Sequence, residues 1–212
     1  MTIELILASA SPRRKQLLLQ IGLTAEAYAA DIDETALPGE SAEDYVLRLA
    51  ELKAKTAADK YYNDIKATGA QNILIIGSDT SVVVDKRILG KPLDKADAIS
   101  MWHLMSGRSH QVLSSVAILH YVKVNQQGDT SLQLSELKRC ISVNTVTMRN
   151  ILEQEMHSYW DSGEPADKAG AYAVQGMAAK WIEKIEGSFS GIMGLPLYEL
   201  SKMLEDYDMD IL

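Results

Sequence analysis

The sequence predicts an α/β fold built on a mixed β-sheet. Short strand–helix units occupy the first half of the chain, which is the pattern of parallel strand pairing. Two long strand-like segments, 109–124 and 130–147, then follow each other across one turn, as in an antiparallel hairpin. With 212 residues, of which 47% are hydrophobic, the chain is long enough to bury a core of its own. We therefore expect a single domain over residues 1–212.

Hydrophobic periodicity and the positions of glycine, proline and capping residues predict the elements of the first half. In order, they are an apolar buried strand at 3–8; a helix capped by Ser11, with Pro12 in its first turn and Gly22 at its end; a second strand at 24–30; a polar loop at 31–40; a helix from the capping sequence at 41–44 to about Tyr61; and a loop at 62–72.

The same signals predict the elements of the second half. In order, they are an apolar strand at 73–76 that Gly77-Ser-Asp-Thr80 interrupts; a hairpin at 81–89 that turns at Asp85-Lys86; a helix capped by Asp94 and ended by Gly107; the two long strands, joined by a turn at 125–129; a short helix capped by Asn150 and ended by Gly163; a strand near 180–186; and a helix after Pro196.

Charge and cysteine content exclude several classes of protein. The net charge of −8 does not suit general nucleic-acid binding, which depends on the neutralisation of phosphates. The chain has one cysteine, Cys140, so it cannot form an intrachain disulfide. The N-terminus lacks the basic region of a signal peptide, and no apolar run approaches the ~20 residues that cross a bilayer. We expect a soluble cytoplasmic protein with no nucleic-acid or membrane partner.

The first candidate site is the turn Ser9-Ala-Ser-Pro-Arg-Arg14, between the first strand and the first helix. Arg13, Arg14 and Lys15 bring positive charge to the start of a helix, where the helix dipole is already positive. A phosphate-bearing ligand in this turn would remove the conflict. Three solvated side chains are the alternative, but the preceding strand favours a site, because α/β proteins bind ligands at strand ends.

Carboxylates follow predicted strands at two places. Asp79 comes after the strand at 73–76 and could hold a metal or take a proton from water, although an aspartate can also bond the backbone of its own turn. The acidic segment Asp31-Ile-Asp-Glu34 is expected to be solvated unless phosphates bind nearby, in which case it is a candidate for Mg²⁺.

Two lysines and one glutamine complete the candidate residues. Lys53 lies near the apolar stripe of its helix, and its ammonium could reach water or a phosphate of the substrate. Lys91 lies in a rigid turn that could direct its ammonium toward a phosphate of the substrate, although most such lysines are simply exposed to solvent. Gln175 offers a donor and an acceptor to the edge of a base. Together the candidates predict a pocket for a nucleotide polyphosphate with a divalent metal, and the chain has no P-loop motif.

Taken together, the motifs resemble the Maf family of nucleoside triphosphate pyrophosphatases over roughly residues 5–200. The resemblance implies an elongated mixed β-sheet flanked by helices, similar to the inosine triphosphate pyrophosphatases, and a homodimer. It implies hydrolysis of a nucleoside triphosphate to the monophosphate and pyrophosphate with Mg²⁺ or Mn²⁺. The segments that carry it, in family order, are Ala8-Ser-Ala-Ser-Pro-Arg-Arg14, Asp31-Ile-Asp-Glu-Thr35, Arg48-Leu-Ala50 with Lys53-Ala54, Gly77-Ser-Asp-Thr80, Gly90-Lys-Pro92, Ser106-Gly107, Asp167-Lys-Ala-Gly-Ala-Tyr172 and Gly194-Leu-Pro196.

The same resemblance implies a role for each candidate. Arg13, Thr80 and Gln175 are the residues of the branch that acts on dTTP and UTP, and modified pyrimidine nucleotides are further candidate substrates. The implied roles are Asp79 as proton acceptor; Glu34 and Asp79 as metal ligands; Lys53 and Lys91 as catalytic residues; and Ser9, Arg13, Arg14, Thr80 and Gln175 as residues that bind and select the substrate. Leu52 departs from the family, which usually has a glutamate there, and Glu51 faces too far round the helix to replace it as a metal ligand.

Two other functions remain open. Asp31-Ile-Asp-Glu-Thr35 also fits the nucleophile motif of haloacid-dehalogenase-type phosphatases, although the strand before it is weak and their second metal motif does not occur. A non-catalytic, nucleotide-binding regulator of septum formation is the other, against which the intact Asp79, Lys53 and Lys91 argue. A phosphatase would release orthophosphate, whereas the favoured enzyme releases pyrophosphate.

Overall fold

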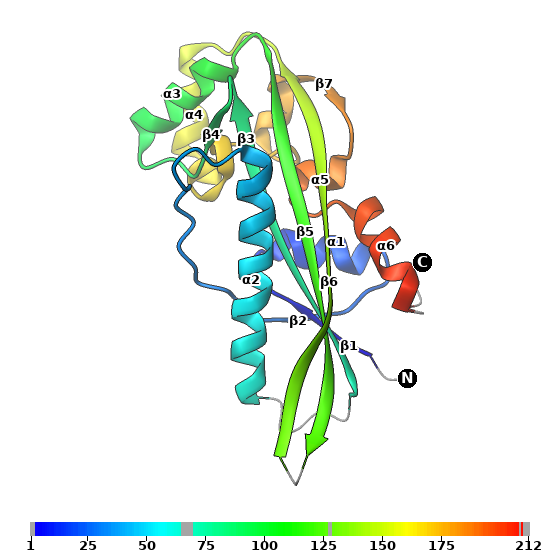
Figure 1. Ribbon diagram of the computed structural model, residues 1–212. Helices are drawn as coiled ribbons and strands as arrows, with labels where there is room; N and C mark the ends of the chain where they lie inside the picture. Colours follow the sequence, from blue (N-terminus) through cyan, green and yellow to red (C-terminus); the bar gives the residue numbers. More distant parts are fainter. Residues whose placement is uncertain (1–2, 65–69, 127–128, 208, 210–212) are drawn as a thin grey trace.

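A seven-stranded mixed sheet forms the frame of the protein in the computed structural model (Figure 1). The structure describes residues 3–64, 70–126, 129–207 and 209. The expected α/β class with a mixed sheet flanked by helices is confirmed. The elements are, in order, β1 (Ile3–Leu7), α1 (Pro12–Gln20), β2 (Glu26–Ala27), α2 (Ala42–Asp64), β3 (Asn72–Val84), β4 (Arg87–Leu89), α3 (Lys95–Met105), β5 (Ser109–Gln126), β6 (Asp129–Met148), α4 (Glu153–Asp161), η2 (Glu164–Asp167), η3 (Ala169–Ala171), η4 (Met177–Trp181), β7 (Ile182–Glu186), α5 (Phe189–Met193), α6 (Leu197–Leu204) and η5 (Glu205–Tyr207).

The strand order leaves part of one edge of β3 open. The order is β2-β1-β3-β5-β6-β7, with β4 paired to β3; β1 pairs in parallel with β2 and β3, and the other pairs are antiparallel. On one side of β3, β1 pairs with Asn72–Ile76 and β4 with Val82–Val84. Between these two ranges, residues 77–81 pair only with β5 among the strands described. This opening lies just beyond the carboxyl end of β1, the place where α/β sheets bind ligands.

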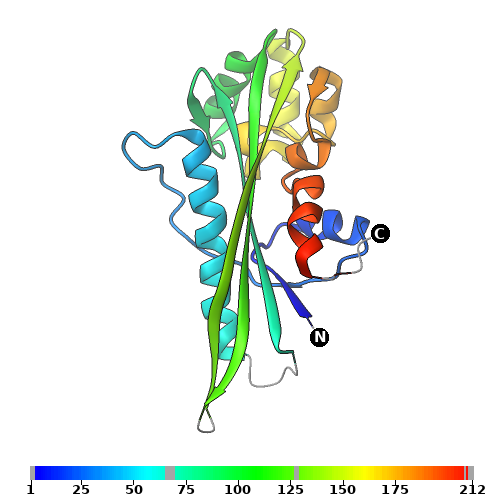
Figure 2. The same cartoon turned by 45° about the vertical axis from the view of Figure 1, so that its right-hand side comes forward.

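Helices cover both faces of the sheet because the side chains of β3 alternate between them. Figure 2 shows α2 on one side of the sheet and α1 and α6 on the other. Ile73 and Ile75 pack in one apolar cluster with α2, while Leu74 and Ile76 pack in another with α1 and α6. A third cluster, around the fully buried Trp102, joins the far ends of β3, β5 and β6 to α3 and α4.

Local capping and turn chemistry confirms some of the sequence predictions. The β3–β4 hairpin turns at Asp85-Lys86, where φ is 49° and 65°. A side-chain oxygen of Asp94 accepts a hydrogen bond from Asp97 N at 2.9 Å and caps α3. None of the helices in the described part of the chain is long and apolar enough to cross a membrane.

Other predicted element boundaries are wrong. Strand β3 is continuous through Gly77-Ser-Asp-Thr80, which the sequence predicted as an interruption. Ser11 precedes α1 but makes no capping hydrogen bond with its side chain. Leu152, not Asn150, is the N-cap of α4. The helix α2 runs three residues past Tyr61, the second strand has only two residues, and α5 was not expected. Residues 65–69 of the predicted loop and 127–128 of the predicted turn lie outside the described residues.

Candidate active site

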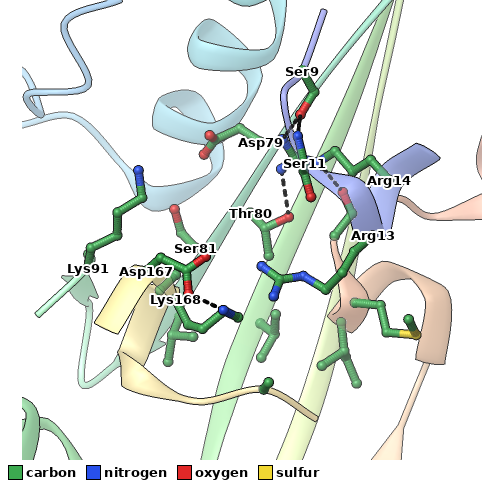
Figure 3. A pocket seen from close by; sticks show the side chains of 18 of the residues that line it. Ser9, Ser11, Arg13, Arg14, Asp79, Thr80, Ser81, Lys91, Asp167 and Lys168 are labelled. Atoms are coloured by element: carbon green, nitrogen blue, oxygen red, sulfur yellow. Dashed lines mark hydrogen bonds and ion pairs between the residues drawn. The ribbon is translucent and has the colours of Figure 1, made fainter. Parts of the chain in front are cut away.

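A cavity of about 710 Å³ lies at the open edge of β3 (Figure 3). Its walls come from the turn after β1, from α2, from β3, from the turn after β4, and from the irregular segments around 167–175 and 192–194. All nine residues to which the resemblance assigns a role line it, namely Ser9, Arg13, Arg14, Glu34, Lys53, Asp79, Thr80, Lys91 and Gln175. Ser9 and Gln175, which are 166 positions apart in the chain, are thus brought to one site.

Gly77 determines how α2 lies against β3. A Cβ atom at Gly77 would lie 2.0 Å from the carbonyl oxygen of Ala50, so a larger residue cannot occupy this position without moving the helix. Lys53 follows Ala50 by about one helical turn, and Asp79 shares a face of β3 with Gly77. The close approach at Gly77 therefore brings Lys53 opposite Asp79.

The ammonium of Lys53 bridges two carboxylates. Its Nζ lies 2.6 Å from Asp79 Oδ1 and 2.7 Å from Glu34 Oε1, and Lys91 Nζ lies 3.7 Å from Glu34 Oε2. Lys53 and Asp79 are 8% and 6% exposed. The interpretation of Lys53 as a lysine that extends to water is therefore wrong, because its charge is held inside the cavity.

The environment shifts the pKa values of the two carboxylates in opposite directions. Burial raises the pKa of Asp79 above its ordinary value, although Lys53 and Arg14 act against this shift. Partial burial also raises the pKa of Glu34, but the hydrogen bond and charge of Lys53, together with Lys91, outweigh burial and lower it overall. Asp79 is thus the stronger base of the pair.

Arg14 is fixed at the start of α1 by contacts with three parts of the chain. Its Nε donates to Gly194 O at 2.8 Å, Nη1 to Ser9 Oγ at 3.2 Å and Nη2 to Thr80 Oγ1 at 3.5 Å. Burial lowers the pKa of the Arg14 guanidinium, and Asp79 opposes that shift. Arg13 extends from the same helix into the cavity (Figure 3).

Some residues of the site were given no role by the sequence analysis. The hydroxyl of Tyr45 donates to Glu34 O at 2.8 Å and so holds the loop that carries Glu34, and burial raises the pKa of Tyr45 to about 12. The only signal in the sequence is a hydroxyl within the apolar stripe of α2. Asp167, Lys168 and Tyr172 also line the cavity, and the Lys168 ammonium forms an ion pair with Asp167.

Only one residue of the acidic segment 31–34 reaches the site. Glu34 lines the cavity, whereas Asp31 is exposed and Asp33 Oδ1 accepts a hydrogen bond from Thr35 N at 2.9 Å. The segment follows no described strand directly, and β2 ends at Ala27. These positions do not support the nucleophile of a haloacid-dehalogenase-type phosphatase.

Leu52, at the position where the family usually has a glutamate, lies away from the cavity. Leu52 is 37% exposed and is not among the residues that line the site. Glu51 pairs with Lys55 and Arg139, with Oε1 2.6 Å from Lys55 Nζ and Oε2 3.1 Å from Arg139 Nη1. A glutamate at position 52 would therefore not face the carboxylates of the cavity, and its replacement removes nothing from them.

The carboxylate pair suits a metal that is bound together with phosphates. No group of three or more His, Cys, Asp or Glu side chains in the described ranges could hold a metal by itself. Glu34 and Asp79 are nevertheless brought side by side by Lys53. Mg²⁺ commonly binds one or two carboxylates and completes its oxygen shell with substrate phosphates and water. The two residues fit such an ion.

Comparison with known proteins gives one consistent result. A sequence model of the family described as Maf-like protein matches residues 4–207. The dTTP/UTP pyrophosphatase of Hahella chejuensis is 44% identical to this chain, over 98% of the chain and 94% of that protein. The proteins of the same name from Pseudoalteromonas translucida and Nitrosomonas europaea are 41% and 43% identical and are covered over 98% and 95% of their lengths.

Proposed function

The chain belongs to the Maf-like protein family, and from this premise we propose that it is a nucleoside triphosphate pyrophosphatase acting on dTTP and UTP. One observation carries the proposal: the ammonium of Lys53 joins Asp79 and Glu34 within a cavity that Arg13 and Arg14 also line. Hydrolysis of a polyphosphate requires a base, a pair of carboxylates that can bind a metal, and several cations. The cavity brings all of these together.

The reaction proposed is hydrolysis between the α- and β-phosphates. The oxygen of a water molecule forms a bond with the α-phosphorus, while the bond from this phosphorus to the oxygen that bridges to the β-phosphorus breaks. Asp79 accepts a proton from the attacking water, and the electron pair of the broken bond leaves with pyrophosphate. Burial raises the pKa of Asp79, which makes it a stronger base than an exposed aspartate.

The cations of the cavity stabilise the charge that develops on the phosphates. Arg14 is held by Gly194, Ser9 and Thr80, and Lys53 is held by two carboxylates, so both point at the cavity before substrate arrives. Groups that are already oriented stabilise a transition state without reorganisation at the moment of reaction. Lys91, which is more exposed, can follow the phosphates as they bind.

A divalent cation, Mg²⁺ or Mn²⁺, would be held by Glu34 and Asp79 together with phosphate oxygens. When bound, such an ion neutralises phosphate charge and polarises the bond to be broken. Lys53, which contacts both carboxylates, would orient them for such an ion. Addition of a chelator is expected to abolish turnover, and Mg²⁺ or Mn²⁺ is expected to restore it.

The choice of a pyrimidine base would depend on Gln175, Arg13 and Thr80. Gln175 lies in the wall of the cavity, and its amide offers a donor and an acceptor, which match the alternating edge of uracil and thymine. Cytosine presents a different pattern, and it would leave polar groups unpaired at a cost of about 1–3 kcal/mol each. The three relatives compared above carry dTTP/UTP in their names.

We further infer a cytoplasmic location, as expected from the sequence, and a homodimer, as the resemblance of the motifs implies. Sedimentation equilibrium of the purified protein tests the dimer. A single species with the 23.4 kDa mass of one chain would contradict it.

A panel of dTTP, UTP, CTP, GTP and ATP with Mg²⁺ or Mn²⁺ tests the function when the products are separated by chromatography. The expected products are a nucleoside monophosphate and pyrophosphate in equal amounts, with dTTP and UTP as the best substrates. Orthophosphate with a nucleoside diphosphate would instead indicate a phosphatase. Binding of nucleotide without turnover would indicate the non-catalytic regulator.

A further inference from the structure

The wall of the cavity that carries Gln175 belongs to no helix or strand. Residues 172–176 connect η3 to η4 in an irregular path, and Ala173, Val174 and Gln175 line the cavity. An irregular segment has no repeating backbone hydrogen bonds of its own to fix its position. Gly176 N donates to Ala173 O at 3.0 Å and closes a turn within the segment. Side chains from other elements then fix this turn relative to the rest of the chain.

One such side chain is Tyr159, on the buried face of α4. Its hydroxyl accepts a hydrogen bond from Ala173 N at 3.1 Å and donates to Glu164 Oε1 at 2.7 Å. Its ring packs against Trp102 and Trp181, with centroids 5.3 Å and 4.9 Å away. Burial and the hydrogen bond to Glu164 raise the pKa of Tyr159, so its hydroxyl stays protonated and keeps both contacts.

The second such side chain is Glu164, at the start of η2. Its Oε1 and Oε2 accept from Met177 N at 3.0 Å and 3.3 Å. A Cβ atom at Gly176 would lie 2.1 Å from Glu164 Oε1, so the carboxylate is pressed directly against the backbone of this turn. Tyr159 and Glu164 thus hold the backbone two residues before Gln175 and two residues after it.

We propose that Tyr159 and Glu164 are positioning residues that hold the backbone on both sides of Gln175 and thereby set the choice of base. The proposal rests on the proposed function, because it needs a base that binds at Gln175. Neither residue lines the cavity. Both act through the backbone of residues 173–177.

The phosphate end of the cavity is held by other elements. Lys53 lies on α2, Asp79 on β3 and Arg14 on α1, and their contacts do not involve residues 173–177. Loss of Tyr159 or Glu164 should therefore affect the recognition of the base and leave the chemical step intact. A hydrogen bond weakens steeply with misalignment, so a small shift of Gln175 is enough to reduce discrimination.

The variants Tyr159→Phe and Glu164→Ala test the proposal, with Glu164→Gln and Tyr61→Phe as controls. Glu164→Gln keeps an oxygen where Oε1 accepts from both Tyr159 and Met177. Tyr61 is also buried, and its hydroxyl donates to a carboxylate, Glu4 Oε2 at 2.6 Å, remote from the cavity. The kcat and KM of each variant are measured for dTTP, for CTP and for methyl triphosphate, which has no base.

We expect Tyr159→Phe and Glu164→Ala to raise KM for dTTP about tenfold. The ratio of kcat/KM for dTTP to that for CTP should fall by a similar factor, because the loss of one hydrogen bond has an effect of this size. Turnover of methyl triphosphate and kcat for dTTP should stay within about twofold. Glu164→Gln and Tyr61→Phe should retain the ratio of the wild type.

An unchanged dTTP-to-CTP ratio in Tyr159→Phe would overturn the proposal, and so would an equal loss on methyl triphosphate. If Glu164→Ala does not fold, Tyr159→Phe is sufficient to test the proposal. Its phenyl ring keeps the aromatic packing of Tyr159, so this variant is expected to fold. A wild type that hydrolyses no nucleoside triphosphate would overturn the proposed function itself, which separates the two failures.

Discussion

The Nζ atom of Lys53 lies 2.6 Å from Oδ1 of Asp79, and both side chains are almost completely buried. The same Nζ lies 2.7 Å from Oε1 of Glu34. Removing charged groups from water is costly unless each is paired, so the lysine and the two carboxylates depend on one another. This arrangement gives the site its structure before any substrate binds.

Replacement of Lys53 with Met should destabilise the protein strongly. The change leaves Asp79 without its buried partner, which typically costs about 3–5 kcal/mol in the free energy of unfolding. The double variant with Asp79→Asn should lose less than the sum of the two single variants, because the two residues interact directly.

Urea denaturation of the four proteins measures this coupling. Lys55→Met is the matched control, since Lys55 lies on the same helix and pairs with Glu51, but its own side chain is exposed. If the losses in the free energy of unfolding of Lys53→Met and Asp79→Asn were strictly additive in the double variant, the two residues would not interact directly.

Replacement of Asp79 with Asn should abolish most of the activity. An amide cannot accept the proton of the attacking water, and the loss of a general base commonly lowers turnover by about 10²-fold or more. The kcat for dTTP is compared with that of Asp31→Asn, an exposed carboxylate outside the cavity. Near-normal turnover of a folded Asp79→Asn protein would remove Asp79 from the mechanism, and inactivity of Asp31→Asn would favour the phosphatase.

Replacement of Arg14 with Ala should reduce the stability of the free protein as well as its catalytic efficiency. The helix dipole alone would predict a slight gain in stability, because a cation leaves the positive end of α1. The structure reverses this expectation, since Arg14 joins α1 to Gly194, Ser9 and Thr80 by three hydrogen bonds. We expect a loss of about 1–3 kcal/mol in the free energy of unfolding.

Arg13→Ala is the control for the Arg14 variant, because no hydrogen bond or ion pair joins Arg13 to another of the described residues. Both variants should raise KM for dTTP, but only Arg14→Ala should lower the midpoint of thermal unfolding. Equal melting temperatures for the two variants would show that the contacts of Arg14 contribute nothing to the fold.

The buried His110 should make the protein less stable in mild acid. Its Nε2 contacts the hydroxyl of Tyr172 at 2.8 Å, and burial, with the charge of Arg108, lowers its pKa to about 4. An unfolded histidine titrates near pH 6.5, so the unfolded state binds a proton first as the pH falls. The stability contributed by neutral His110 is therefore present above pH 6.5 and is lost between pH 6.5 and about 4.

Between pH 7.5 and pH 5, the contribution of His110 to the free energy of unfolding should fall by about 2 kcal/mol. The His110→Gln variant, which cannot titrate, should lose correspondingly less stability than the wild type over that interval in urea denaturation. His103→Gln removes an exposed histidine and should behave as the wild type does. An identical pH dependence for His110→Gln and the wild type would disprove the assignment.

The contrast between Asp94 and Gly77 shows why some features could be predicted from the sequence and others could not. The cap of α3 by Asp94 depends on residues three positions apart, so local chemistry is sufficient to predict it. The local sequence around Gly77 predicts an interruption of the strand. In the fold, its missing side chain makes room for Ala50 of α2, and β3 continues through it.

Most members of the candidate site were predictable, but their contacts were not. All nine residues singled out from the motifs line the cavity. The role of Tyr159 and Glu164 behind Gln175 had no signal in the sequence, because neither residue lies in the cavity and each acts on the backbone of another segment.

The sequence by itself determined the class of fold, the order of most elements, the turn at Asp85-Lys86 and most of the residues at the site. These depend on interactions between residues that are near in the chain, or on motifs whose residue types suffice. Only the tertiary structure decided that Lys53 meets Asp79, 26 residues away, and that Arg14 meets Gly194, 180 residues away. Such contacts follow from how α2 and the C-terminal segment pack on opposite faces of one sheet, and packing depends on the whole chain.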